Sequence, residues 1–100
     1  MTKELYNKMK NYFEGKYFKS HDGKYVKVIS VYETPNGTCI SYQQLEDKRF
    51  ASEPLEDFMG QVKNNVGKIA AKFTPATYNE IQSVLSNKEM SEYIENIKTL

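Results

Sequence analysis

Residues 24–33 form a ten-residue run rich in β-branched and aromatic side chains, and this run narrows the possible folds of the chain more than any other segment. Such residues favour extended backbone, and turn-forming sequences bound the run, Asp22-Gly23 before it and Thr34–Gly37 after it. Both parities are rich in apolar side chains, with Val26, Val28 and Tyr32 on one and Tyr25, Ile29 and Val31 on the other. This pattern predicts a long, bent strand that is covered in part on each face.

Shorter runs of the same character surround it. They predict strands at residues 16–19, 38–45 and 49–52, the last after the polar turn Glu46–Lys48. Alternation in the run 38–45 places Ile40 and Tyr42 on one face, and Cys39, Ser41 and Gln43 on the other face, which we expect to be solvated. The segment 16–53 therefore predicts a small antiparallel SH3-like barrel or curled sheet of four or five strands.

Helical periodicity occupies both ends of the chain. At the N-terminus Thr2 can cap a helix that ends near Gly15, and its apolar stripe is Leu5, Met9, Tyr12 and Phe13. From Pro54 to Phe73, apolar residues at spacings of three and four predict one long helix or two short ones, although Gly60 and Gly67 weaken the long version.

A further helix is predicted to begin at Thr74-Pro75, with a cap followed by a proline at the first helical position. Ser86-Asn87 interrupts it, and a last apolar stripe follows at Met90, Tyr93, Ile94 and Ile97. The chain is thus expected to form a single α+β domain over 1–100, with an N-terminal helix and two or three C-terminal helices.

Composition limits the compartment and the partners. No apolar run approaches the roughly 20 residues that span a bilayer, and the first residues lack the apolar centre of a secretion signal. The single cysteine, Cys39, excludes an intramolecular disulfide. We therefore expect a cytoplasmic protein without a membrane partner.

Charge is unevenly spread along a chain whose net charge is only +1. Lysines predominate over acids in residues 1–32, and acids predominate over basic residues in 33–57. Such asymmetry can serve docking or self-association, but it falls short of the basic footprint of a typical nucleic-acid-binding domain. Two solvated clusters that pair within the fold explain it equally.

Few residues can perform catalysis. His21 and Cys39 are each the only residue of their kind, and no local signature surrounds either of them. The adjacent acids Glu46-Asp47 and Glu56-Asp57 point in different directions on a strand or helix, so they are poor acid/base pairs. No phosphate-binding loop or nucleophile motif is present. We expect no enzyme, no metal site and no cofactor.

Two binding surfaces remain as hypotheses, beside the alternative that alternation buries about half of the aromatic rings of the predicted β segment in the core. The first is the solvated strand face with the acidic turn, which would bind another protein through Cys39, Ser41, Gln43, Glu46 and Asp47. The second is a lysine and tyrosine face, which would stack and neutralise nucleic acid through Lys16, Tyr17, Lys19, Lys24, Tyr25 and Lys27.

Four segments resemble the short bacterial SH3-like small-barrel domains of unknown function: Gly15–Phe18, Gly23–Val28, Cys39–Gln43 and Pro54–Met59. The resemblance covers residues 15–62 and implies the barrel, with no implied activity.

We therefore expect a non-catalytic protein-binding module, such as a phage or mobile-element-encoded inhibitor or adaptor. The alternatives are a nucleic-acid-binding small barrel and a subunit that forms homo-oligomers through its apolar C-terminal helices.

Overall fold

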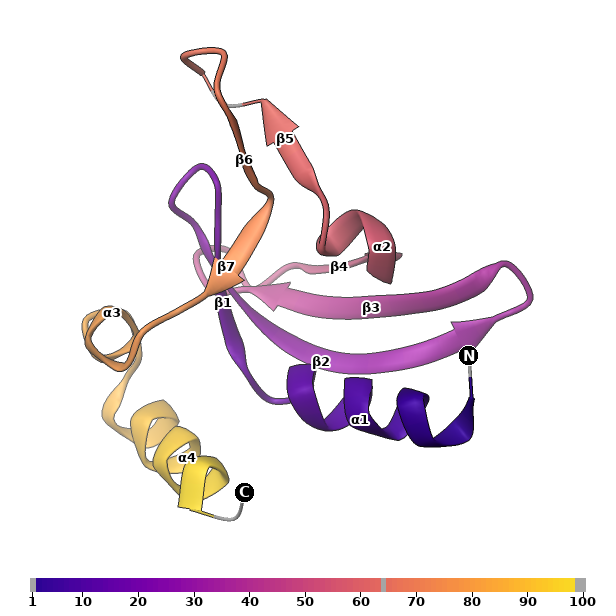
Figure 1. Ribbon diagram of the computed structural model, residues 1–100. Coiled ribbons are helices and arrows are strands. Elements are labelled where there is room, and N and C mark those ends of the chain that lie inside the picture. The colour runs from indigo at the N-terminus through magenta and orange to yellow at the C-terminus, as the bar shows by residue number, and fades with distance from the viewer. Residues whose placement is uncertain (1, 64, 99–100) are drawn as a thin grey trace.

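The computed structural model describes residues 2–63 and 65–98, with side chains as far as residue 95 (Figure 1). Its elements are α1 (Lys3–Phe13), β1 (Tyr17–Ser20), β2 (Tyr25–Thr34), β3 (Gly37–Gln44), β4 (Phe50–Pro54), α2 (Leu55–Phe58), β5 (Gln61–Lys63), β6 (Ile69–Ala71), β7 (Phe73–Pro75), α3 (Tyr78–Gln82) and α4 (Asn87–Lys98). The α+β class, the N-terminal helix and the C-terminal helices are confirmed. None of the described helices is both long and apolar enough to cross a membrane.

The main sheet has five antiparallel strands in the order β4-β3-β2-β1-β7, and β5 and β6 form a separate hairpin that projects from it (Figure 1). Of the two predicted forms, a barrel or a curled sheet, the structure shows a sheet that does not close, because β4 and β7 lie at opposite edges and no ladder joins them in the described part of the chain. The sheet is nevertheless curled, since Glu53 on β4 forms an ion pair with Lys72, the residue before β7. Side chains therefore join the two edges that the backbone leaves open.

A β-bulge explains why both parities of β2 are apolar. The pairing with β3 shifts register between Val28 and Ser30, which leaves Ile29 without a partner and 43% exposed. After the bulge, Val31 points to the same face as Val28, and both are fully buried. The bulge thus keeps the β-branched residues on the core face while it bends the strand.

Helix α1 covers the edge of β2 where β1 no longer runs beside it. The carboxylate of Glu14 accepts a hydrogen bond from the Val31 N–H at 2.9 Å. The Val31 carbonyl accepts from Lys10 Nζ at 2.9 Å and from the Tyr6 hydroxyl at 3.0 Å. Two side chains of α1 and that of its C-cap residue Glu14 therefore satisfy backbone groups that a neighbouring strand would otherwise pair.

The core lies between one face of the sheet and the helices α1 and α2. Its buried members are Phe13, Phe18, Val26, Val28, Val31, Ile40, Tyr42, Leu55 and Phe58. Phe58 is 1% exposed, and its ring centroid lies 4.2 Å from that of Phe73 and 5.4 Å from that of Phe18. The predicted burial of Ile40 and Tyr42 is confirmed.

The predicted helix over 54–73 is wrong beyond its first turn. Only Leu55–Phe58 is helical, and the chain then forms the hairpin of β5 and β6 and the edge strand β7. The predicted helix start at Thr74-Pro75 is also wrong, since both residues belong to β7. The start lies at Thr77, whose hydroxyl accepts from the Glu80 N–H at 3.2 Å in a capping box.

The physical reason is that strand pairing outweighs the helical spacing of the apolar residues in this segment. Gly67 adopts a φ of +80°, which an α-helix does not accommodate, and β7 completes the sheet by pairing with β1. The C-terminal stripe does form a helix, α4, although the side chain of Ile97 lies outside the part of the chain that the structure describes.

Candidate functional site

The side of the sheet opposite the core, here called the outer face, carries both predicted binding surfaces. Strand register aligns Tyr17 with Lys27, Lys27 with Gln43, and Gln43 with Phe50 in one row. A second row contains Ser30, Ser41 and Ser52, and a third contains Tyr32, Cys39 and Pro54. The protein-binding and the lysine and tyrosine hypotheses therefore share one continuous face.

The C-terminal helices α3 and α4 cover the part of this face over β1 and the start of β2. The Tyr17 ring is 5% exposed and meets Tyr93 of α4 edge to face, with centroids 5.4 Å apart. Ile81 of α3 is 1% exposed. Burial raises the pKa of Tyr17 to about 12, and the nearby Glu89 adds to the shift. Tyr17 is consequently a neutral packing residue at pH 7.

Glu80 of α3 binds two of the residues predicted to contact nucleic acid. Its Oε2 lies 3.1 Å from Lys19 Nζ and accepts a hydrogen bond from the Tyr25 hydroxyl at 3.0 Å. The hydrogen bond from the Thr77 backbone, together with those from Lys19, the Thr77 hydroxyl and Tyr25, holds the pKa of Glu80 at about 2. A carboxylate therefore occupies the position where a phosphate would have to bind.

The other lysines of that hypothesis also have partners in the fold. Lys16 donates to the Asn11 carbonyl at 2.8 Å, and Lys27 lies over the Tyr17 ring at 5.9 Å. Lys24 lies 3.7 Å from Glu46 in an exposed pair. These residues are thus dispersed among intramolecular contacts, with no shared cationic groove between them.

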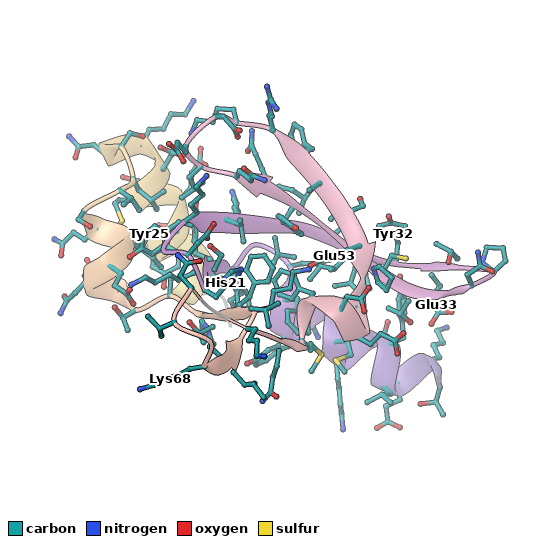
Figure 2. The ribbon with its side chains drawn as sticks, turned by 90° about the horizontal axis from the view of Figure 1, so that it is seen from above. His21, Tyr25, Tyr32, Glu33, Glu53 and Lys68 are labelled. Atoms are coloured by element: carbon teal, nitrogen blue, oxygen red, sulfur yellow. The ribbon has the colours of Figure 1, made fainter. Side chains whose placement is uncertain are left out.

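The rest of the outer face is open, and we call it the open half-face. It comprises Ser30, Tyr32, Cys39, Ser41, Gln43, Phe50, Ser52 and Pro54. Figure 2 shows Tyr25 beside the C-terminal helices and Tyr32 far from them, toward the tip of the β2–β3 hairpin. None of the eight residues is charged, although 27% of the chain is. The site is therefore an uncharged surface of hydroxyls, aromatic rings and a thiol.

Two features make this surface accessible. Phe50 is 69% exposed, which is unusual for a ring on a paired strand. Strand β4, which bears Phe50 and Ser52, is an edge of the main sheet, and its outer side pairs with no strand among residues 2–63 and 65–98. Sequence reasoning missed Phe50 and Ser52 as part of this surface, because only the register places them beside Gln43 and Ser41.

The acidic turn of the protein-binding hypothesis, with Glu46 and Asp47, lies next to the open half-face. Its polar groups contact mainly other residues of this chain. Asp47 accepts a hydrogen bond from the Arg49 N–H at 3.0 Å, and Gln43 donates to the Lys48 carbonyl at 3.1 Å. Lys48 adopts a φ of 62°. The turn therefore orients Gln43, while Glu46 faces Lys24.

Cys39 and His21, the one cysteine and the one histidine of the chain, lie too far apart to act as a catalytic pair. His21 lies in the turn before β2, whereas Cys39 pairs with Tyr32 near the other end of that strand. Tyr32 lies seven residues beyond Tyr25 along β2, which amounts to about 23 Å. Within the described ranges, no group of three or more His, Cys, Asp and Glu side chains could hold a metal ion.

Comparison of the chain with protein-family models, curated proteins and solved structures finds no match. The resemblance to SH3-like small-barrel domains therefore stays a prediction, and the site is argued from its geometry alone.

Proposed function

We propose that this chain is a non-catalytic module that binds another protein through the open half-face and strand β4. One observation carries the proposal: an uncharged surface with an exposed phenylalanine adjoins a sheet edge that pairs with no strand in the described part of the chain. Interface centres are depleted in charge and enriched in tyrosine and phenylalanine. A small inhibitor or adaptor would act by covering the surface of the partner protein that it binds.

Strand addition is the binding mode that fits this edge. An extended segment of the partner would pair its backbone with β4, and its side chains would alternate between the core side and the open half-face. Phe50, Ser52 and Pro54 would meet uncharged side chains, since a charge there would be desolvated without a counter-charge.

Protein is favoured over nucleic acid because of where the lysines lie. Lys19 and Lys24 already face carboxylates, and α4 buries Tyr17. Binding of phosphates would have to displace these contacts, whereas the open half-face needs no rearrangement.

A photocrosslinking experiment tests the proposal. A photoreactive phenylalanine analogue replaces Phe50, and the chain is incubated in nuclease-treated extract of the native host. We expect a protein adduct that Ser52→Lys abolishes, because it places a charge at the edge strand. Ser91→Lys, the same change on exposed α4, should keep the adduct.

An adduct that survives Ser52→Lys, or that Ser91→Lys removes equally, would overturn the assignment of the surface. An adduct that forms in untreated extract but not in nuclease-treated extract would move the function to nucleic acid, and steep salt dependence of its yield would support that outcome.

A further inference from the structure

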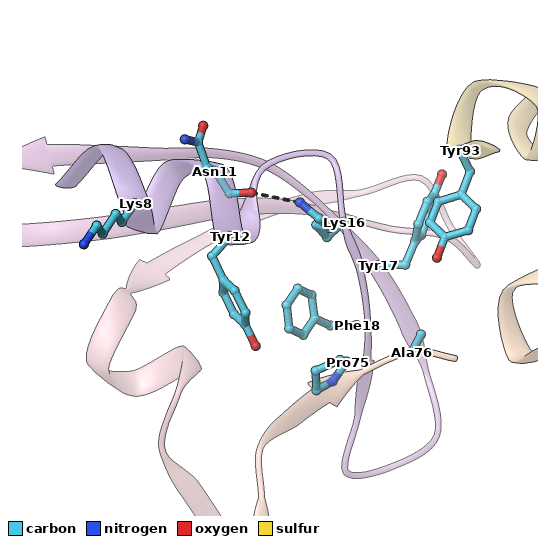
Figure 3. Close-up of a pocket in the computed structure, with 9 residues that line it drawn as sticks. All are labelled: Lys8, Asn11, Tyr12, Lys16, Tyr17, Phe18, Pro75, Ala76 and Tyr93. Atoms are coloured by element: carbon cyan, nitrogen blue, oxygen red, sulfur yellow. Dashed lines mark hydrogen bonds between the residues drawn. The ribbon is translucent and has the colours of Figure 1, made fainter. Parts of the chain in front are cut away.

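A groove of about 480 Å³ lies at the opposite end of the sheet from the open half-face, between α1, β1, the end of β7 and α4 (Figure 3). Its size falls in the range of roughly 300–1,000 Å³ that small-molecule sites occupy. The proposed function does not use this groove, and of the residues predicted to contact nucleic acid only Lys16 and Tyr17 line it.

The groove is lined mainly by apolar and aromatic groups. Figure 3 shows Tyr12 and Phe18 facing each other, with Pro75 below them and the paired rings of Tyr17 and Tyr93 at the far end. A second hollow of about 160 Å³ shares Tyr12, Phe18 and Pro75 and continues to Phe58 and Phe73. The two hollows adjoin at these three shared residues, and we call them together the apolar track.

The charged groups of the groove have one sign. Lys8 and Lys16 line it, and no lining residue carries a carboxylate. Lys16 Nζ donates to the Asn11 carbonyl at 2.8 Å, which leaves two of its three donor hydrogens for a ligand (Figure 3). Lys8 is exposed and forms no ion pair with the described part of the chain.

We propose that this groove binds a linear anionic amphiphile, a molecule with one carboxylate head and an unbranched apolar tail, such as a medium-chain fatty acid. The tail lies along Phe18 and Pro75, where it removes apolar surface from water. The carboxylate accepts hydrogen bonds from Lys16 and attracts Lys8. A cationic or doubly anionic ligand fits less well, because the track beyond the lysines is apolar.

Titration with decanoate and with decan-1-ol at pH 7, followed by ¹H–¹⁵N spectra of the whole chain, tests this proposal. We expect shifts at the amides of Phe18, Ala76 and Tyr93, and decanoate binding at least about five times as tightly as the alcohol. Lys16→Met keeps the apolar stem and should lower the decanoate affinity to that of the alcohol, without changing the affinity for the alcohol.

Lys24→Met is the matched control, since Lys24 is an equally cationic residue outside the groove, and it should leave both affinities unchanged. The spectra also report directly whether each variant is folded. Equal affinities of the acid and the alcohol, an unaffected Lys16→Met, absence of any shift, or shifts centred on Phe50 would each overturn the proposal.

Discussion

At the scale of single residues, Glu80 links three parts of the fold. Its carboxylate accepts hydrogen bonds from Tyr25 on β2 and from the Thr77 backbone, and it pairs with Lys19 on β1. These donors stabilise the ionised form, so the pKa lies at about 2, below the ordinary value of 4.5. Glu80 thereby holds α3 against the outer face and keeps Lys19 and Tyr25 from other ligands.

The sign of the pH dependence follows from this lowered pKa. The contribution of Glu80 to stability is complete above pH 4.5 and is lost as the pH falls toward 2, because the unfolded chain takes up the proton first. Glu80→Gln should lower the free energy of unfolding at pH 7, and the difference from the wild type should shrink between pH 4.5 and pH 2. Urea unfolding followed by circular dichroism at several pH values measures it.

Glu92→Gln removes one carboxylate from an exposed position on α4 and serves as the control. A difference between wild type and Glu80→Gln that is constant from pH 7 to pH 2 would contradict the role of the ionised carboxylate.

At the scale of elements, the segment after α2 shows how an apolar period can mislead. Val66 and Ile69 have helical spacing with their neighbours, but they are 76% and 71% exposed on the β5–β6 hairpin. Their spacing therefore does not mark a core-facing stripe. Gly67 in the turn between the two strands has a φ of +80°, a conformation in which a side chain is strained.

The substitution Gly67→Ala distinguishes a helix from a hairpin at this position, because its effect on the free energy of unfolding has the opposite sign in the two structures. In a helix the substitution would stabilise by about 1 kcal/mol, because alanine is the better helix former. In the hairpin it should destabilise by about 1–2 kcal/mol, because alanine must adopt a left-handed conformation. We expect the second result in urea unfolding, together with faster amide exchange at Val62 and Ala70.

Gly37→Ala is the matched control, since Gly37 also has a positive φ, of +125°, and open space around it. It should lower stability in the same direction. A rise in stability and in helical ellipticity for Gly67→Ala would restore the helical interpretation.

At the scale of the whole molecule, side chains hold the sheet curled without closing it. The Glu53–Lys72 pair joins the two edges, with side chains only 16% and 28% exposed, and the rings of Tyr42 and Phe73 meet beneath it at 5.4 Å. Because one edge is β4, this curl also presents the open half-face. The Glu53–Lys72 ion pair therefore stabilises the curled sheet and also holds the proposed binding edge, β4, in its place.

A double-mutant cycle measures how strongly the Glu53–Lys72 ion pair stabilises the fold. Lys72→Met leaves the Glu53 carboxylate partly buried without its partner and should cost about 1–3 kcal/mol, and adding Glu53→Gln should recover part of that loss. The exposed pair Lys24–Glu46 provides the control cycle, with an expected coupling of about 0–1 kcal/mol. Urea unfolding measures both couplings. Equal coupling energies in the two cycles would show that the Glu53–Lys72 pair stabilises the fold no more than an exposed ion pair does.

Elements whose signals are local follow from the amino-acid sequence alone. Thr2 caps α1, Gly23 and Gly37 with positive φ turn the two hairpins, and the alternation of β3 buries Ile40 and Tyr42. These features depend on interactions within a few residues, so periodicity and turn chemistry suffice to predict them.

The other features of the fold depend on contacts between residues that are distant in the sequence. The open sheet, the strands β5 to β7, and the placement of Phe50 and Ser52 beside Cys39, Ser41 and Gln43 all depend on which strands pair and in which register. Likewise, the burial of Tyr17 and the capture of Lys19 depend on where α3 and α4 pack. A pattern along the chain specifies which side of an element is apolar, but the partner of that side is chosen by contacts between residues distant in sequence.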